Sequence, residues 1–233
     1  MEEPELTKVT GAQLRIGVGG CARRLAKELA EPKSKNFGSG ARFALANRLH
    51  ADARLAHATP GTPNPSGFVA PTDLEPEHQR VYAAAVRGYF ALFGHVPARS
   101  ADDAFDEWET QLPDHGVRLV GNVGLPFEHA DGTCELRRLL LGGRPLDDVD
   151  VRFAALRARP WAQERIRIVS ADLLEVRIVA LDVELERDAA EHDAWLAKRV
   201  AELRAHAATG RARPGAECAR CAFVAGCEPH GRR

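Results

Sequence analysis

The sequence predicts an α/β (α+β) fold, in which a helical N-terminal half precedes a mixed β-sheet flanked by helices. Three observations favour this class. Apolar residues recur at helical spacing in the N-terminal half, strand-like runs of Val, Ile and Leu dominate 117–185, and a second helical pattern follows at 189–210. The chain then ends in a short segment that holds three of its five cysteines. The sequence contains neither an internal repeat nor a low-complexity tract.

The N-terminal half opens on a helix start signal. Thr10 and Gln13 have the spacing of a capping box, in which each side chain accepts a hydrogen bond from the backbone N–H of the other residue. A short helix is expected to follow. Glycines at 19–20 should break it, and the pattern at 21–30 predicts that the helix restarts there.

The middle of the chain changes from helix to strand. Residues 58–73 are rich in Pro and Gly and predict an exposed loop, whereas 74–94 have the apolar spacing of an amphipathic helix. The sequence HADG at 129–132 predicts a hairpin turn between the first two strands. The helix predicted at 189–210 should end at Gly210. The expected strands are 117–128, 133–143, 165–174 and 176–185, with a further helix at 151–164.

Charge and hydropathy exclude several classes of protein. Lys and Arg total 32 against 33 Asp and Glu, so the chain has no excess of basic residues, although a local basic face is still allowed. The first residues are acidic and lack the apolar run of a secretory signal, and no stretch reaches the roughly 18 apolar residues of a membrane span. A cytoplasmic protein is therefore expected, and metal binding explains a cluster of thiols there better than disulfides do.

The C-terminal cysteines have the spacing of metal ligands. Cys218, Cys221 and Cys227 form the pattern C-x2-C-x5-C, which supplies three thiolates to one site. The fourth ligand is either the local His230, which would complete a small zinc site, or the distant Cys21. Thiolates suit both zinc and an iron–sulfur cluster, so spacing leaves the choice open. Cys134 lies within a strand and is expected to be a core residue.

With these cysteines, the chain resembles the RecB-like PD-(D/E)xK nucleases that carry a 4Fe–4S cluster, a branch that includes CRISPR-associated RecB-like exonucleases and AddB-like subunits. The segments that carry the resemblance are LRIGVGGCARRLAKEL around Cys21 and AATGRARPGAE ahead of the C-terminal cysteines. The resemblance implies a restriction-endonuclease-like mixed central sheet in one domain over 1–233. Its expected parts are a helical segment 1–57, a loop 58–73, a core 74–209 and a cysteine-rich tail 210–233.

The resemblance also implies a ligand set. Cys21, Cys218, Cys221 and Cys227 would hold a 4Fe–4S cluster, with zinc as the alternative metal, and His230 would not be a ligand. Such a cluster would join the N-terminal segment to the C-terminal tail, and its binding energy would contribute to folding.

The nuclease motifs of that family are incomplete here. The family uses an Asp on one strand, then an Asp or Glu on the next strand with a Lys two residues later, to hold a divalent ion and position water. The first position is Gly124, and the acidic position of the second strand falls on Arg137 or Arg138. The upstream His position is Arg42, with His50 two turns further on. A protein without nuclease activity is therefore expected.

A migrated nuclease site is the alternative. Glu135 and Arg137 form an E-x-R sequence, with Glu128 or Asp131 as the second carboxylate. Arginine is a poor replacement for the family's lysine, because its pKa stays above about 12. Asp131 is also the expected turn residue of the hairpin, and Glu128 fits a solvated strand end.

Basic residues near the expected cluster and at the lost carboxylate positions predict contacts with nucleic-acid phosphates. The protein is accordingly expected to bind DNA, as single strands or at duplex ends, or to act as a scaffold beside a helicase or nuclease partner. A zinc-binding interaction module is the remaining alternative. The candidate DNA-binding residues are Arg23, Arg24, Lys27, Arg42, Arg137, Arg138, Arg213 and Arg220.

Overall fold

In the computed structural model, the chain forms two compact units. Unit 1 combines Met1–Lys35, Glu109–Gly121 and Ala189–Arg233, and unit 2 combines Asn36–Trp108 and Asn122–Asp188. The expected segment boundary at 57/58 falls inside unit 2. The structure describes residues 6–16, 20–30, 41–101, 109–121, 123–142, 146–162, 164–213, 218, 221 and 227.

Unit 1 is built on a small three-stranded sheet with the strand order β1-β4-β3. Strand β1 (Thr7–Thr10) runs parallel to β4 (Val117–Val120), and β3 (Thr110–Leu112) pairs antiparallel with β4 across a 3-10 turn at Pro113–His115. The helices of this unit are α1 (Gly11–Ile16), α2 (Ala22–Ala30) and α6 (Ala189–Ala208).

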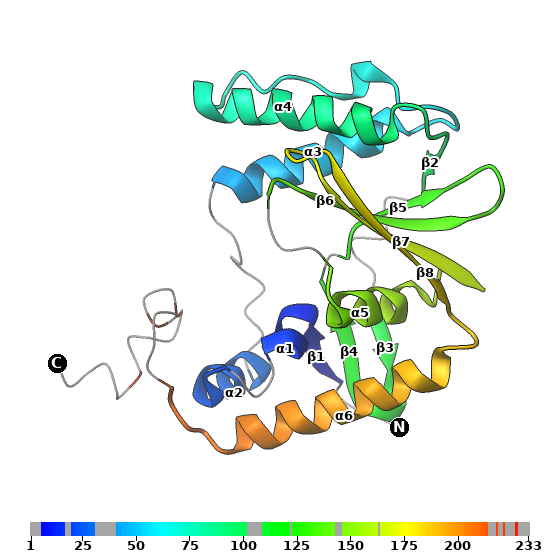
Figure 1. The fold of residues 1–233 in the computed structure, drawn as a ribbon. Coiled ribbons are helices and arrows are strands. Elements are labelled where there is room, and N and C mark those ends of the chain that lie inside the picture. The colour runs from blue at the N-terminus through cyan, green and yellow to red at the C-terminus, as the bar shows by residue number, and fades with distance from the viewer. Residues whose placement is uncertain are drawn as a thin grey trace. The chain divides into compact units, whose positions relative to one another are not determined.

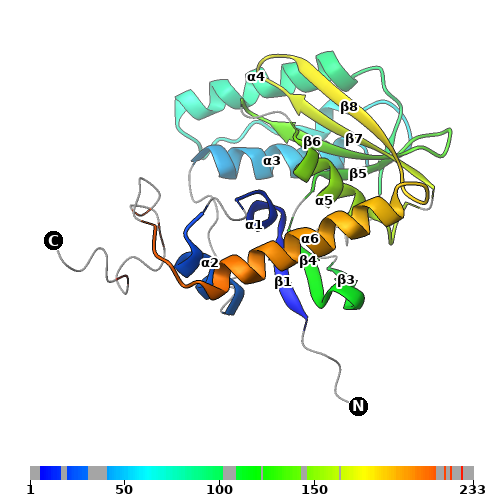
Figure 2. The same cartoon turned by 60° about the horizontal axis from the view of Figure 1, so that its bottom comes forward.

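The predicted capping box is confirmed at the junction of β1 and α1. The Thr10 N–H donates to Gln13 Oε1 at 2.8 Å, and the Gln13 N–H donates to Thr10 Oγ1 at 3.2 Å. Helix α2 then packs alongside α6 (Figure 2). The predicted break between the first two helices and the end of α6 near Gly210 are also confirmed, with Gly210 in the left-handed conformation at φ 58°.

Unit 2 contains a five-stranded mixed sheet with the order β2-β5-β6-β7-β8 (Figure 1). The predicted hairpin joins β5 to β6 in antiparallel register, and α5 (Asp148–Ala158) then carries the chain across to β7, which runs parallel to β6. Strand β8 returns antiparallel to β7 at one edge. The strands are β2 (Arg99–Ser100), β5 (Leu125–Glu128), β6 (Cys134–Leu140), β7 (Arg165–Asp172) and β8 (Arg177–Glu184).

Helices cover both faces of this sheet. Helices α3 (Ala41–Ala56) and α4 (Pro76–Phe93) lie on one face and α5 (Asp148–Ala158) on the other (Figure 1), while a short 3-10 turn occupies Pro65–Gly67 within the predicted loop. Side chains alternate along β6, so Glu135, Arg137 and Leu139 face α3 and α4. Arg138 faces α5, where it pairs with Asp150 at 3.3 Å.

The run 117–128, which the sequence predicts as one strand, is two strands in two different sheets. The chain passes from β4 of unit 1 to β5 of unit 2 through Gly121 and Gly124, whose φ angles of 114° and 131° suit glycine. Periodicity also failed to reveal β1, β2 and β3, because strands of two to four residues are too short for an alternating pattern. Among the described residues, no helix is long and apolar enough to cross a membrane.

Candidate functional site

Cys21 occupies the N-cap position of α2. Its carbonyl accepts the first helical hydrogen bond, from the Leu25 N–H at 3.0 Å, and its Sγ accepts a hydrogen bond from the Arg213 N–H at 3.4 Å. Burial acts to raise the pKa of the Cys21 thiol, but the backbone N–H groups of Arg213, Arg24 and Arg23 outweigh it, and the net effect lowers that pKa. A helix N-terminus favours the thiolate, which is the form that binds metal.

The segment after α6 lies against Cys21 within unit 1. The Arg23 N–H donates to the Arg211 carbonyl at 3.2 Å, and the His206 ring nitrogen Nε2 lies 3.1 Å from the Gly20 carbonyl. The Cys218 thiol donates to the Arg213 carbonyl at 3.9 Å, a weak contact of sulfur. One residue, Arg213, therefore contacts Cys21 through its N–H and Cys218 through its carbonyl.

The other predicted ligands are placed less completely. The Cys221 N–H donates to the Cys218 carbonyl at 3.1 Å, which forms the tight turn expected between them. Cys227 is half-buried, and His230 lies outside the described residues. In the described part of the chain, no three His, Cys, Asp or Glu side chains are arranged to hold a metal ion. Cys134 lies on β6 of unit 2 as predicted, but it is half-buried and not part of the core; its partial burial raises the pKa of its thiol.

The predicted DNA-binding residues fall into three environments. Arg23, Arg24 and Lys27 lie half-buried on α2, with Arg24 paired to Glu28 at 2.6 Å, and Arg213 is exposed beside Cys21. Arg137 is wholly buried and Arg138 faces α5, so the two do not form one exposed basic patch on an edge strand. The side chain of Arg42 and the whole of Arg220 lie outside the described residues.

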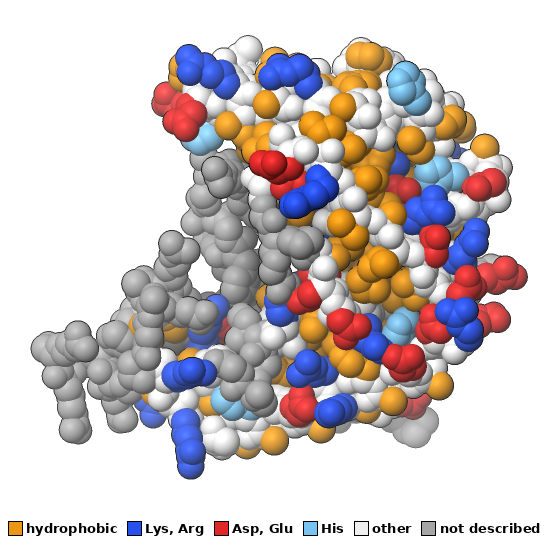
Figure 3. All heavy atoms as spheres, in the orientation of Figure 1, with side chains coloured by type: hydrophobic (Ala, Val, Ile, Leu, Met, Phe, Trp, Pro, Cys, Tyr) orange, Lys and Arg blue, Asp and Glu red, His pale blue; other side chains and the backbone are white. Residues whose placement is uncertain are grey.

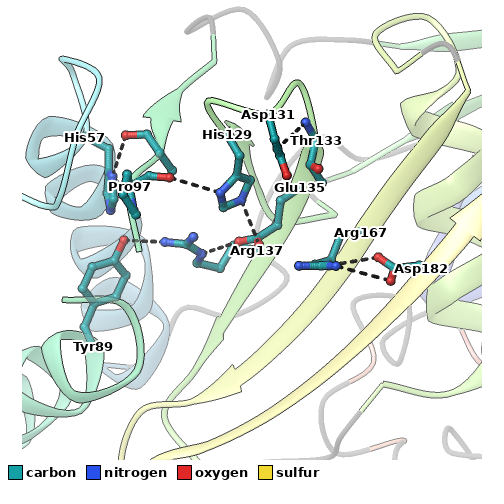
Figure 4. Close-up of polar contacts among 11 residues, drawn as sticks. His57, Tyr89, Pro97, His129, Asp131, Thr133, Glu135, Arg137, Arg167 and Asp182 are labelled. Atoms are coloured by element: carbon teal, nitrogen blue, oxygen red, sulfur yellow. Dashed lines mark hydrogen bonds and ion pairs between the residues drawn. The ribbon is translucent and has the colours of Figure 1, made fainter. Parts of the chain in front are cut away.

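Unit 2 holds a second group of polar residues, inside its core (Figure 4). Arg137 donates through Nε to Glu135 Oε1 at 2.7 Å and through Nη1 to the Tyr89 hydroxyl at 2.9 Å. Its guanidinium also lies over the rings of Phe93 and Phe127, with Cζ 3.8 Å and 4.1 Å from their centroids. Burial raises the pKa of Tyr89 to about 12. The charge of Arg137 is therefore neutralised within the core.

His129 connects this group to the surface. Its Nδ1 lies 3.1 Å from the Pro97 carbonyl, which only accepts, and its Nε2 lies 3.2 Å from Glu135 Oε2. Burial acts to raise the pKa of Glu135, but the His129 hydrogen bond and the charge of Arg137 outweigh it and hold that pKa below its ordinary value. Glu135 is thus held as an anion between the guanidinium of Arg137 and the ring of His129.

His57, one residue beyond the end of α3, completes the group and was not singled out from the sequence. Its Nδ1 donates to the Ala98 carbonyl at 3.1 Å, and its ring lies edge-on to Tyr89 and Phe127. Its Nε2 is buried and has no hydrogen-bond partner among the residues that the structure describes. Burial lowers the pKa of His57, so the ring is neutral in the folded protein.

His57 should make the stability of the protein depend on pH. The folded state keeps the ring neutral where the unfolded chain protonates it, so stability should fall as the pH drops below about 6.5. The free energy of unfolding, measured with urea, should fall by up to about 1.4 kcal/mol for each pH unit between about pH 7 and 5, because the unfolded chain binds this one additional proton. In His57→Gln the free energy of unfolding should depend less steeply on pH. In His95→Gln, a substitution at an exposed position, the pH dependence should stay as in the wild type. An unchanged slope in His57→Gln would contradict this assignment.

The structure does not bring together the carboxylates of the alternative nuclease site. Glu128 pairs with Arg99 at 2.7 Å on the opposite face of the sheet from Glu135. Asp131 is the turn residue of the hairpin, since its Oδ1 accepts from the Thr133 N–H at 2.9 Å. Glu135 is already bound to Arg137 and His129.

Gly124, at the position of the family's first Asp, has little room for a side chain. An added Cβ would lie 3.0 Å from the carbonyl carbon and oxygen of Arg137, and the φ of 131° strains any other residue. A carboxylate at this position would therefore require the β5–β6 pairing to shift.

No protein-family model matches the chain, and no curated protein matches it in sequence. The resemblance to RecB-like nucleases therefore stays a prediction. The fold agrees with its coarser part, a mixed sheet flanked by helices.

Proposed function

We propose that the protein is an iron–sulfur protein of the RecB-like nuclease fold that binds DNA, or scaffolds a DNA-processing complex, without cutting the nucleic acid. One observation carries this proposal: Cys21, a thiol at a helix N-terminus, contacts Arg213, which also contacts Cys218. Two cysteines that are far apart in the sequence thus share one neighbour within unit 1, and this supports a shared metal centre.

The residues that would hold the cluster are Cys21, Cys218, Cys221 and Cys227. Four thiolates suit a 4Fe–4S cluster, and N–H groups directed at Cys21 Sγ stabilise its negative charge. The cluster would link the N-terminal segment to the tail and stabilise the fold. Zinc, with His230 as a local ligand, is the alternative, and both metals fit a reducing, cytoplasmic compartment.

The residues of unit 2 support the proposal that the protein does not cut nucleic acid. A side chain at Gly124 would press against the backbone of β6, and the φ of 131° strains any other residue there, so a carboxylate is disfavoured at this position. Glu135 carries its charge, but Arg137 and His129 already satisfy it. Divalent-metal-dependent cleavage that is lost in Glu135→Ala would contradict this part of the proposal and favour a migrated nuclease site.

DNA binding is proposed for the basic residues around Cys21 in unit 1. Arg211 and Arg213 are exposed, and both contact the α2 N-terminus through their backbones, which places them close to the proposed cluster. Arg23 and Lys27 lie on α2 itself. The cluster would fix the backbone that carries these cations and so present them to phosphates. This arrangement supports binding to single-stranded DNA or duplex ends. It also suits docking beside a helicase or nuclease partner.

Fluorescence anisotropy with labelled single-stranded DNA tests the DNA proposal. We expect affinity to fall steeply with salt, and the double variant Arg211→Glu, Arg213→Glu to weaken binding and reduce the log–log salt slope by about 2. Arg187→Glu is the matched control, because Arg187 is an exposed arginine paired with Asp188, away from the cysteines in sequence. Equal losses in both variants, or no binding by the wild type, would leave scaffolding as the function.

A further inference from the structure

Strand β8 is an exposed apolar edge of the unit 2 sheet. Its first six residues are exposed, and no described strand pairs with its outer side. Apolar side chains gather over the β7–β8 hairpin on the face shown in Figure 3. Five of the seven large exposed apolar side chains in the described chain lie in this hairpin, namely Leu174, Val176, Ile178, Val179 and Leu181.

The backbone of β8 offers a template for another strand. In an antiparallel edge strand, every second residue points its N–H and C=O away from the neighbouring strand. Natural edges are normally blunted by shortness, proline, lysine or bulges. The strand at the opposite edge, β2, is protected in this way, because it has only two residues and carries an Arg99–Glu128 ion pair. Strand β8 has eight residues, pairs with β7 without a bulge, and contains neither proline nor lysine.

The occupant of this edge must be apolar on both sides. The register with β7 places Ile178 and Ala180 on the α3/α4 face of the sheet and Val179 and Leu181 on the α5 face. An ordinary edge-binding peptide needs only one apolar face. Strand β8 is itself a strand of the required length with both faces apolar, so a second copy supplies the matching partner.

The charges of β8 favour an antiparallel second copy. Arg177 begins the strand, and two acidic residues lie at its other end: Asp182, which pairs with Arg167 of the same copy, and Glu184. Antiparallel pairing places the basic end of one copy beside the acidic end of the other, within a Debye length of about 10 Å. Parallel pairing would instead place like charges together.

We propose that two copies of the chain associate through β8, pairing antiparallel about a two-fold axis near Ala180, so that two five-stranded sheets become one continuous sheet. Because this two-fold axis is perpendicular to the sheet, the α3/α4 faces of the two copies lie on one side of the continuous sheet and the α5 faces on the other. Val179 of one copy therefore lies opposite Leu181 of the other, twice in each dimer. The proposal is independent of the metal centre, because all of these residues belong to unit 2.

Light scattering on a sizing column, with sedimentation to cover a wide concentration range, tests this proposal. The wild type should be a dimer, and Val179→Lys or Leu181→Glu alone should shift it to monomer, because each buries an unpaired charge. The double variant Val179→Lys, Leu181→Glu should restore the dimer, since each lysine then faces a glutamate of the other copy. Leu55→Lys, at a site 63% exposed on α3, is the matched control and should stay dimeric.

Circular dichroism on each variant establishes that it is folded, which is expected because both positions are exposed. A monomeric wild type at every concentration would overturn the proposal. So would a dimer that Val179→Lys and Leu181→Glu leave intact, or a double variant that remains monomeric.

Discussion

Arg137→Met is expected to destabilise the protein by about 3–5 kcal/mol, the cost of leaving a buried ionic partner without its counter-charge. Arg137 is fully buried, and its removal leaves Glu135 with His129 alone and the Tyr89 hydroxyl without its donor. The stacking of the guanidinium on Phe93 and Phe127 is lost as well. Urea unfolding at pH 7 measures the effect.

Two further variants separate a charge effect from a loss of packing. Arg167→Met removes an exposed arginine paired with Asp182 on the adjacent strand, and we expect a change within about 1 kcal/mol. Replacing both partners, Glu135→Leu with Arg137→Met, should be milder than Arg137→Met alone, because no unpaired charge is left in the core. If the double variant is the less stable of the two, the lost contacts rather than the unpaired carboxylate account for the result.

Loss of the proposed metal centre should have the second large effect. A cluster that joins residues 21 and 218 closes a loop of 218 − 21 = 197 residues. By analogy with a disulfide across a loop of this size, the link contributes about 5 kcal/mol. Removing the metal with a chelator should therefore lower the thermal midpoint of the wild type by roughly 10–20 °C.

The same treatment on variants shows whether Cys21 belongs to the centre. Cys21→Ser should already have the low midpoint and respond little to chelation. Cys134→Ser should respond as the wild type does, since Cys134 lies on β6 of unit 2. A wild-type midpoint that is indifferent to chelation would show that no metal contributes to stability.

Local signals predicted much of the fold. The Thr10–Gln13 capping box and the HADG turn each involve residues within five positions, and both were confirmed. The helices at α4 and α6 are long enough for their apolar spacing to be evident. The small sheet of unit 1 was not predicted, because β1 and β4 pair across 110 residues of sequence, from Thr7 to Val117.

The buried polar group of unit 2 could not be predicted from residue types alone. An arginine in a strand normally faces solvent, yet the alternation along β6 places Arg137 under α4, where Tyr89 and Glu135 receive it. The sequence did contain one usable signal. Glu135, Arg137 and Leu139 are spaced two residues apart, so in a strand the two charged side chains lie on the same face as an apolar residue. His57 and His129 join them through the tertiary fold, since each lies in a different loop.

The metal centre is tested most directly by a visible absorption spectrum with iron, sulfide and zinc analysis on anaerobically purified wild type, Cys21→Ser and Cys134→Ser. We expect a brown wild type with about four irons, loss of colour and iron in Cys21→Ser, and retention of both in Cys134→Ser. A colourless zinc protein that is indifferent to Cys21→Ser would contradict this expectation, and would mean that the C-terminal cysteines bind metal without the N-terminal segment.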